Sequence, residues 1–215
     1  MKKIYQKISA ILLLIGVIFS MFGCANRAPK LEEIYDRAVE LIENSYELNE
    51  IFFGAGLPYC DRNLPVYQSL YSDYTTIGYT SDYNIVSRNA GYQSVEELKI
   101  AAEKVYSKAL LESSVYPAMF DGLMQQNVAT GSTYLQARYI EDNQNFYVLI
   151  EDPSTYHATP LIYDYSTMEI IRPSNASQVQ LSIVAWEENS PNNPFQMRLS
   201  LVKENGVWLL DKLTV

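Results

Sequence analysis

The sequence predicts an α+β fold, in which N-terminal helices pack on a bent antiparallel β-sheet that ends in a C-terminal β-meander. In the N-terminal half, apolar residues recur at the helical period of about 3.6. From Thr133 onward they alternate with polar residues, which is the period of a strand. Helices gathered ahead of strands along a chain are typical of α+β proteins.

The first predicted helix covers residues 31–53. Pro29 precedes it, acidic Glu32 and Glu33 suit its positive N-terminal end, and Gly54 ends it. Its apolar residues fall on one stripe, which predicts a face that packs on the sheet: Leu31, Ile34, Ala38, Leu41, Ile42, Leu48 and Phe52.

Two further helices are expected. Ser94 and Glu97 form a Ser-x-x-Glu capping box, which predicts a helix from that point to about Glu112. A short third helix is expected over residues 117–126, because Pro117 suits the first turn of a helix.

The strands are predicted from alternation and turn residues. Strands are expected over 135–139 and 146–150, near 158–164 and near 167–172, and then over 179–185 and 195–201. Asn205-Gly206 predicts a tight hairpin into a last strand, residues 207–215, because both residues tolerate positive φ. The last three strands would form the meander.

Residues 54–93 fit neither period and hold seven of the 18 Tyr residues. Short extended segments are expected near 74–80 and 83–87. Exposed Tyr clusters suit peptide, glycan or protein contacts, because the ring supplies a flat apolar face and a polar tip. Tyr also packs well on sheets and loop edges, and that alternative stays open. The candidate partner-binding residues are Tyr71, Tyr74, Tyr79 and Tyr83.

Residues 1–23 predict a lipoprotein signal peptide. Three Lys residues precede an apolar run of about fifteen residues, too short to span a bilayer, and the run ends in Gly23-Cys24. A small residue before Cys resembles the bacterial lipobox, which implies a lipid on Cys24 and a location on the extracytoplasmic face of the cell membrane. The alternative is an ordinary signal peptide of a secreted protein. Residues 24–30 would form the tether, and residues 31–215 one domain.

Composition and motifs argue against several classes. Loss of three Lys and no acid with the signal peptide changes the net charge from −9 to −12, which disfavours a nucleic-acid partner. No catalytic or cofactor motif occurs, so neither an enzyme nor a metal or cofactor site is expected. Cys60 and the single His, His157, are the one nucleophile–base pair of their kind and match no protease signature.

The ending Lys203-Glu204-Asn205-Gly206-Val207-Trp208, behind helices and a long meander, resembles cystatin-like and nuclear-transport-factor-two-like domains of bacterial lipoproteins. The segment from Tyr83 through the capped helix to Ser107 is similar to IseA-type inhibitors of cell-wall endopeptidases. The resemblance implies a binding module, with inhibition or regulation of a cell-wall hydrolase as its sharpest form. The alternative function is a small-ligand pocket between helix and curved sheet, lined by residues such as Leu41 and Tyr46.

Overall fold

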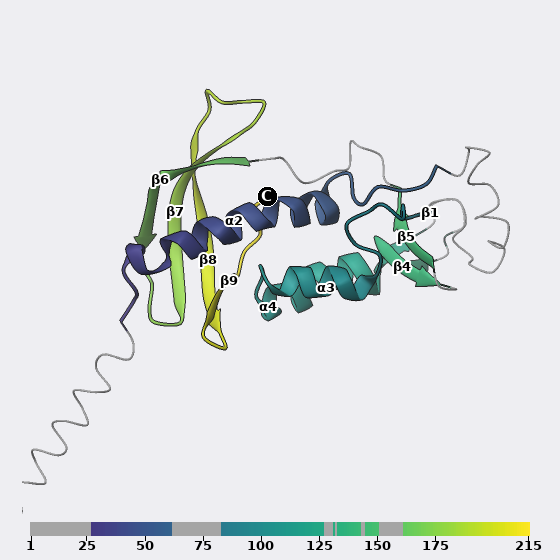
Figure 1. The fold of residues 1–215 in the computed structure, drawn as a ribbon, viewed down its shortest axis with the longest axis horizontal. Coiled ribbons are helices and arrows are strands. Elements are labelled where there is room, and N and C mark those ends of the chain that lie inside the picture. Colours follow the sequence, from purple (N-terminus) through teal and green to yellow (C-terminus); the bar gives the residue numbers. More distant parts are fainter. Residues whose placement is uncertain (1–26, 62–82, 127–130, 132, 143–144, 151–160) are drawn as a thin grey trace, which may run out of the picture.

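A computed structural model describes residues 27–61, 83–126, 131, 133–142, 145–150 and 161–215. It confirms the α+β class, with an N-terminal helix, further helices and antiparallel sheets that include a C-terminal four-stranded meander. The long helix α2 lies across the meander with its N-terminal half and extends beyond it toward the smaller strands (Figure 1). Within the described residues, no helix is both long and apolar enough to cross a membrane.

Helix α2 (Leu31–Phe53) has the predicted bounds. The predicted stripe is buried at Ile34, Ala38, Leu41 and Ile42 and belongs to the main hydrophobic core. These side chains share that core with residues of the four-stranded sheet, so burial of the apolar stripe fixes the helix on the sheet.

The four-stranded sheet has the order β6-β7-β8-β9, from strands β6 (Leu161–Ile171), β7 (Gln178–Glu187), β8 (Phe195–Glu204) and β9 (Val207–Leu210). The predicted hairpin between β8 and β9 is confirmed, with positive φ at Asn205 and Gly206. The segments expected near 158–164 and 167–172 instead meet in one strand, β6. Its register shifts between Asp164 and Glu169, where the Asp164 side chain accepts the Ser166 N–H.

The remaining described strands form two more sheets, so the prediction of one bent sheet is corrected. Strands β1 (Tyr83–Ile85), β5 (Asn145–Leu149) and β4 (Tyr139–Asp142) pair in that order. Strands β2 (Leu123–Gln126) and β3 (Thr133–Gln136) form a two-stranded antiparallel ribbon. Among the described residues, β4 pairs with the next strand β5, whereas β1 pairs with β5 from a distant part of the chain, and the meander strands pair in sequence order.

The predicted helix over 94–112 is broken in two. Ser94 caps α3 (Val95–Glu103) as predicted, but Ser107 then accepts the Leu110 N–H and starts a second helical run. This run joins α4 (Lys108–Leu110), η3 (Leu111–Val115) and η4 (Pro117–Asp121). It ends at Gly122, where φ is 89°, so residues 123–126 are strand and not the helix expected there.

The second helical run has wide turns around Pro117. The Tyr116 N–H donates to the Leu111 carbonyl, five residues back, in place of the usual four. Pro117 has no N–H, and its ring would clash with the carbonyl four residues back in a regular helix. The wider turn relieves that clash, so the helix continues through the proline to Asp121.

A buried chain of hydrogen bonds ties the C-terminal segment to α2. Tyr106 donates to Asn49 Oδ1 at 2.6 Å, and Asn49 Nδ2 donates to Thr214 Oγ1 at 2.6 Å. The Ser45 hydroxyl donates to the Ile42 carbonyl at 2.6 Å, so its 2.6 Å contact with Thr214 Oγ1 uses the threonine proton. All four polar side chains are buried, and each hydroxyl proton in the chain has an acceptor.

Candidate functional site

Most of the residues predicted for lipid attachment or partner binding, and His157 of the weighed Cys60–His157 pair, lie outside the described part of the chain. Cys24 falls in residues 1–26, Tyr71, Tyr74 and Tyr79 fall in 62–82, and His157 falls in 151–160. Predictions about these five residues therefore stay predictions.

Tyr83 lies in strand β1 and departs from the expectation of an exposed tyrosine. Only 3% of it is exposed, and its hydroxyl donates to the Ala137 carbonyl. Its ring packs in a small cluster with Ile85 and Tyr147. Tyr83 therefore packs within the three-stranded sheet and offers no exposed face to a partner. Packing of this kind is the role that was left open for Tyr in this segment beside partner binding.

Cys60 is also buried, and its backbone N–H donates to the Ile85 carbonyl at 2.8 Å. No other described residue is a cysteine, so the described part holds no disulfide. Among the described residues, no three His, Cys, Asp or Glu side chains gather closely enough to hold a metal ion.

The alternative of a ligand pocket beneath α2 predicted a cavity lined by Leu41 and Tyr46. Leu41 is fully buried, and so are Leu181, Ile183 and Leu199 of the facing strands. Tyr46 is half-buried, and its ring lies 6.4 Å from that of Tyr163. Side chains fill the described helix–sheet contact at these positions, which favours packing over a pocket there.

A surface groove of about 730 Å³ lies instead where four parts of the fold meet. Its walls come from the N-terminal half of α2, the break between α3 and α4, the second helical run, and the β8–β9 hairpin. Cationic, anionic and apolar side chains all line it: Arg37, Glu40, Glu103, Lys104, Tyr106, Lys108, Leu111, Glu112, Tyr116, Glu204, Asn205, Val207 and Leu209.

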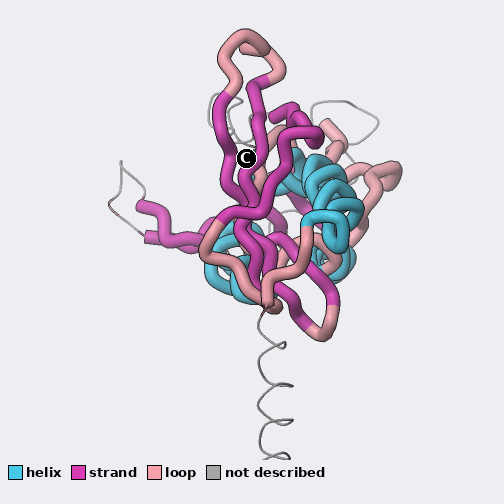
Figure 2. Tube along the Cα trace, turned by 90° about the vertical axis from the view of Figure 1, so that its left-hand side faces the viewer, coloured by secondary structure: helices cyan, strands magenta, loops and turns pink. Residues whose placement is uncertain are grey.

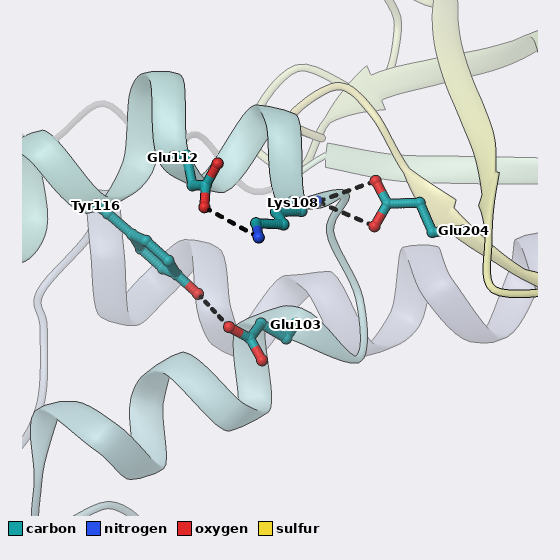
Figure 3. A network of polar contacts seen from close by, with 5 residues as sticks. All are labelled: Glu103, Lys108, Glu112, Tyr116 and Glu204. Atoms are coloured by element: carbon teal, nitrogen blue, oxygen red, sulfur yellow. Dashed lines mark hydrogen bonds and ion pairs between the residues drawn. The ribbon is translucent and has the colours of Figure 1, made fainter.

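Lys108 joins two walls of this groove (Figure 3). Its backbone N–H donates to both carboxylate oxygens of Glu204, at 3.2 and 3.4 Å, and its ammonium lies 3.5 Å from Glu112 Oε1. The Glu204 carboxylate thus meets the positive end of the second helical run, where an anion is stabilising. The contact fastens the β8–β9 hairpin to the helix that begins at Ser107.

Tyr116 and Glu103 form the opposite side of the groove. The Tyr116 hydroxyl donates to Glu103 Oε1 at 3.2 Å (Figure 3), and the Lys99 ammonium lies 5.0 Å from the centre of the Tyr116 ring. Burial, followed by the negative charge of Glu103, raises the pKa of Tyr116 above its usual range. The phenol therefore keeps its proton at neutral pH and acts as a hydrogen-bond donor to the carboxylate.

Arg37 closes the groove at α2. Its Nε donates to the Trp208 carbonyl at 3.1 Å and its Nη2 to the Lys104 carbonyl at 3.0 Å, while Nη1 lies 3.0 Å from Glu40. One guanidinium thereby connects α2, the end of α3 and edge strand β9. The Lys104 side chain is in no ion pair with any described residue, so its charge is available to a bound segment.

These contacts give the groove a definite chemical character. Val207, which is 49% exposed, provides apolar surface beside the buried Leu111 and Leu209, while Lys104 and the paired carboxylates provide a charged rim. A short peptide segment that carries both apolar and charged side chains fits such a lining. This groove was not predictable from the sequence, because its residues come from four segments that no local pattern links. The one local signal was the Asn205-Gly206 turn.

A comparison with models of known protein families finds no match to the chain, and a comparison with curated proteins finds none.

Proposed function

We propose that the chain is a lipid-anchored protein of the extracytoplasmic membrane face, whose single α+β domain binds another protein of the cell envelope. The observation that carries the location is the N-terminal sequence, in which three Lys residues, a short apolar run and Gly23-Cys24 follow one another. A diacylglycerol on Cys24 would supply two acyl chains, enough for stable anchoring.

The position of α2 sets the distance between the domain and the membrane in this proposal. The helix begins at Leu31, so only seven residues, 24–30, separate it from the anchor. Seven residues span at most about 25 Å when fully extended. A partner of the domain would therefore lie close to the outer surface of the membrane, where enzymes that remodel the cell wall also reach.

The sharpest form of the proposal is inhibition or regulation of a cell-wall hydrolase. The groove supports a binding role, because it combines the exposed apolar side chain of Val207 with the Lys104 ammonium, which forms no ion pair with a described residue. The Tyr-rich segment supports it too, since Tyr71, Tyr74 and Tyr79 could contact a partner through flat rings. The resemblance to IseA-type inhibitors gives the partner class. The mechanism is steric: the domain occupies the substrate cleft of the hydrolase.

The proposal is tested with hydrolases extracted from the cell wall and with purified wall as the substrate. Added protein should slow wall release in a dose-dependent way, and Lys104→Glu or the triple change of Tyr71, Tyr74 and Tyr79 to Ala should weaken the effect. Arg88→Glu is the matched control, because Arg88 is exposed and does not line the groove. Unchanged wall release, with no partner recovered from cross-linked envelopes, would contradict the proposal.

A further inference from the structure

A second pocket, of about 390 Å³, lies at the N-terminal end of α2, where the predicted tether enters the domain. Its charged lining residues are Arg27, Lys30 and Lys203, together with Glu33. Three cations against one anion give the pocket a net charge of +2, in a chain whose net charge is −9. The pocket therefore has the opposite sign to the protein as a whole, and it suits an anionic ligand.

Backbone hydrogen bonds hold the segments that carry these cations. The Lys203 N–H, in β8, donates to the Ser177 carbonyl at 2.8 Å and so joins the end of β8 to the turn between β6 and β7. The carbonyl of Lys30, the residue before α2, accepts the Glu33 N–H at 3.1 Å. The pocket is thus part of the folded domain and does not depend on the tether alone.

Trp208 of β9 provides the aromatic wall of the pocket. It is 9% exposed, and the Lys203 ammonium lies 5.4 Å from the centre of its ring. Its carbonyl accepts the Arg37 Nε–H at 3.1 Å, which holds β9 against α2. None of the three cations of the pocket is in an ion pair with another described residue, so their charges are available to a ligand.

The position of the pocket identifies an anionic lipid as its occupant. Arg27 is the third residue after Cys24, and three residues span at most about 10 Å. A lipid on Cys24 would therefore hold the pocket at the headgroup layer, where the anchor gives headgroups a much higher effective concentration than any solute. Phosphatidylglycerol supplies a negative phosphate for the cations, and its glycerol hydroxyls can donate to Glu33.

We propose that this pocket binds the phosphate of an anionic lipid beside the anchor, and that this contact holds the domain in one orientation on the membrane. The β6–β7 turn and the β8–β9 hairpin lie at the same lower end of the molecule as the start of α2 (Figure 1, Figure 2), so they would face the bilayer. The domain as a whole is acidic, so an anionic bilayer disfavours orientations that turn the pocket away. The inference rests on the proposed lipid on Cys24, because the anchor brings the pocket to the membrane.

Fluorine NMR of the full lipidated chain tests the contact, with fluorotryptophan at both tryptophans. Trp208 lines the pocket, whereas Trp186 lies near the far end of β7 and serves as the internal reference. Gln178 pairs with the end of β8 beside the pocket, and β7 rises about 25 Å from there to Trp186. In phosphatidylcholine nanodiscs with a rising fraction of phosphatidylglycerol, the Trp208 signal should shift in a saturable way and the Trp186 signal should not.

A charge-reversal variant tests which side chains bind the headgroup. Arg27→Glu/Lys30→Glu should raise the apparent dissociation constant for phosphatidylglycerol at least about tenfold, because it reverses two of the three cations and leaves Lys203 in place. Arg88→Glu/Arg198→Glu is the matched control, since it makes the same change of net charge at two exposed residues outside the pocket and should bind as wild type does. Circular dichroism checks that each variant folds.

The mass of the N-terminal peptide and the membrane partition of each chain report the anchor separately from the pocket. A lipidated chain whose Trp208 signal ignores phosphatidylglycerol, or responds equally in the charge-reversal variant and its control, would overturn the pocket proposal and leave the anchor standing. A shift of Trp208 that phosphatidylcholine alone or inorganic phosphate reproduces would overturn the assignment to an anionic lipid. An unmodified Cys24 would overturn the anchor and the pocket proposal together.

Discussion

The buried hydrogen-bond chain from Tyr106 to Ser45 allows a quantitative test of how the core holds the C-terminal segment. In the variant Asn49→Leu, the Tyr106 hydroxyl loses its acceptor and Thr214 Oγ1 loses a donor. A buried polar group left without its partner costs about 1–3 kcal/mol, and a lost hydrogen bond costs about 1 kcal/mol. We therefore expect Asn49→Leu to lower the free energy of unfolding by about 2–4 kcal/mol.

The partner variant Tyr106→Phe should cost about 1–3 kcal/mol, because it leaves the buried Asn49 Oδ1 without its donor. In the double variant, the hydroxyl that Asn49→Leu would strand is no longer present. The double variant should therefore be more stable than the sum of the single effects implies, by about 1–2 kcal/mol. Urea unfolding, followed by circular dichroism and by tryptophan fluorescence, measures each free energy.

Ser113→Ala is the matched control for these two variants. Ser113 is exposed, and its hydrogen-bond partners Leu110 and Ser114 are not those of Asn49, so Ser113→Ala combined with Asn49→Leu should give additive effects. If Asn49→Leu and Tyr106→Phe also add to within about 0.5 kcal/mol, the two side chains are not coupled and the hydrogen-bond chain does not hold the core as described.

Two further predictions concern Ser107, which caps the second helical run, and Tyr106 of the buried hydrogen-bond chain. Ser107→Ala removes the acceptor of the Leu110 N–H and the donor to Asp211, so it should lower the free energy of unfolding in urea by about 1–2 kcal/mol. Ser113→Ala should change this free energy little. Equal losses in the two variants would contradict the capping role of Ser107. Burial raises the pKa of Tyr106 to about 12 from an ordinary value of 10.0. The contribution of the protonated phenol to the free energy of unfolding is therefore complete below pH 10. It is lost as the pH rises from 10 to about 12, because the unfolded chain ionises in this range before the folded chain does. Unfolding free energies across this range should fall less steeply in Tyr106→Phe, and identical slopes would count against a protonated buried Tyr106.

Elements with strong local patterns were predictable from the sequence. The stripe of α2 and the alternation of β7 each identify one buried face, and in the structure Leu41 and Leu181 are both fully buried. Asn205-Gly206 marked its hairpin, because few residue pairs tolerate positive φ in both positions. Local chemistry was sufficient in each of these cases.

The break after α3, the helix through Pro117 and the groove were not predictable, because competing local signals or contacts between distant segments decide them. The apolar stripe from Leu98 continues past residue 103, yet Ser107 caps a new helix, and its hydrogen bond to Asp211 comes from the far end of the chain. Pro117 suggested a helix start, but wide turns carry the existing helix through it. The groove depends on contacts such as Arg37 to Trp208, which no local pattern contains.

The mass of the mature N-terminal peptide, isolated from membranes, tests the central claim most directly. The account predicts a peptide that begins at Cys24 and carries a diacylglycerol on its sulfur, together with a Cys24→Ser chain that leaves the membrane fraction or stays as precursor. An unmodified Cys24 in a secreted chain, or a processed Cys24→Ser chain that stays in the membrane fraction, would contradict the anchored location on which the proposed function rests.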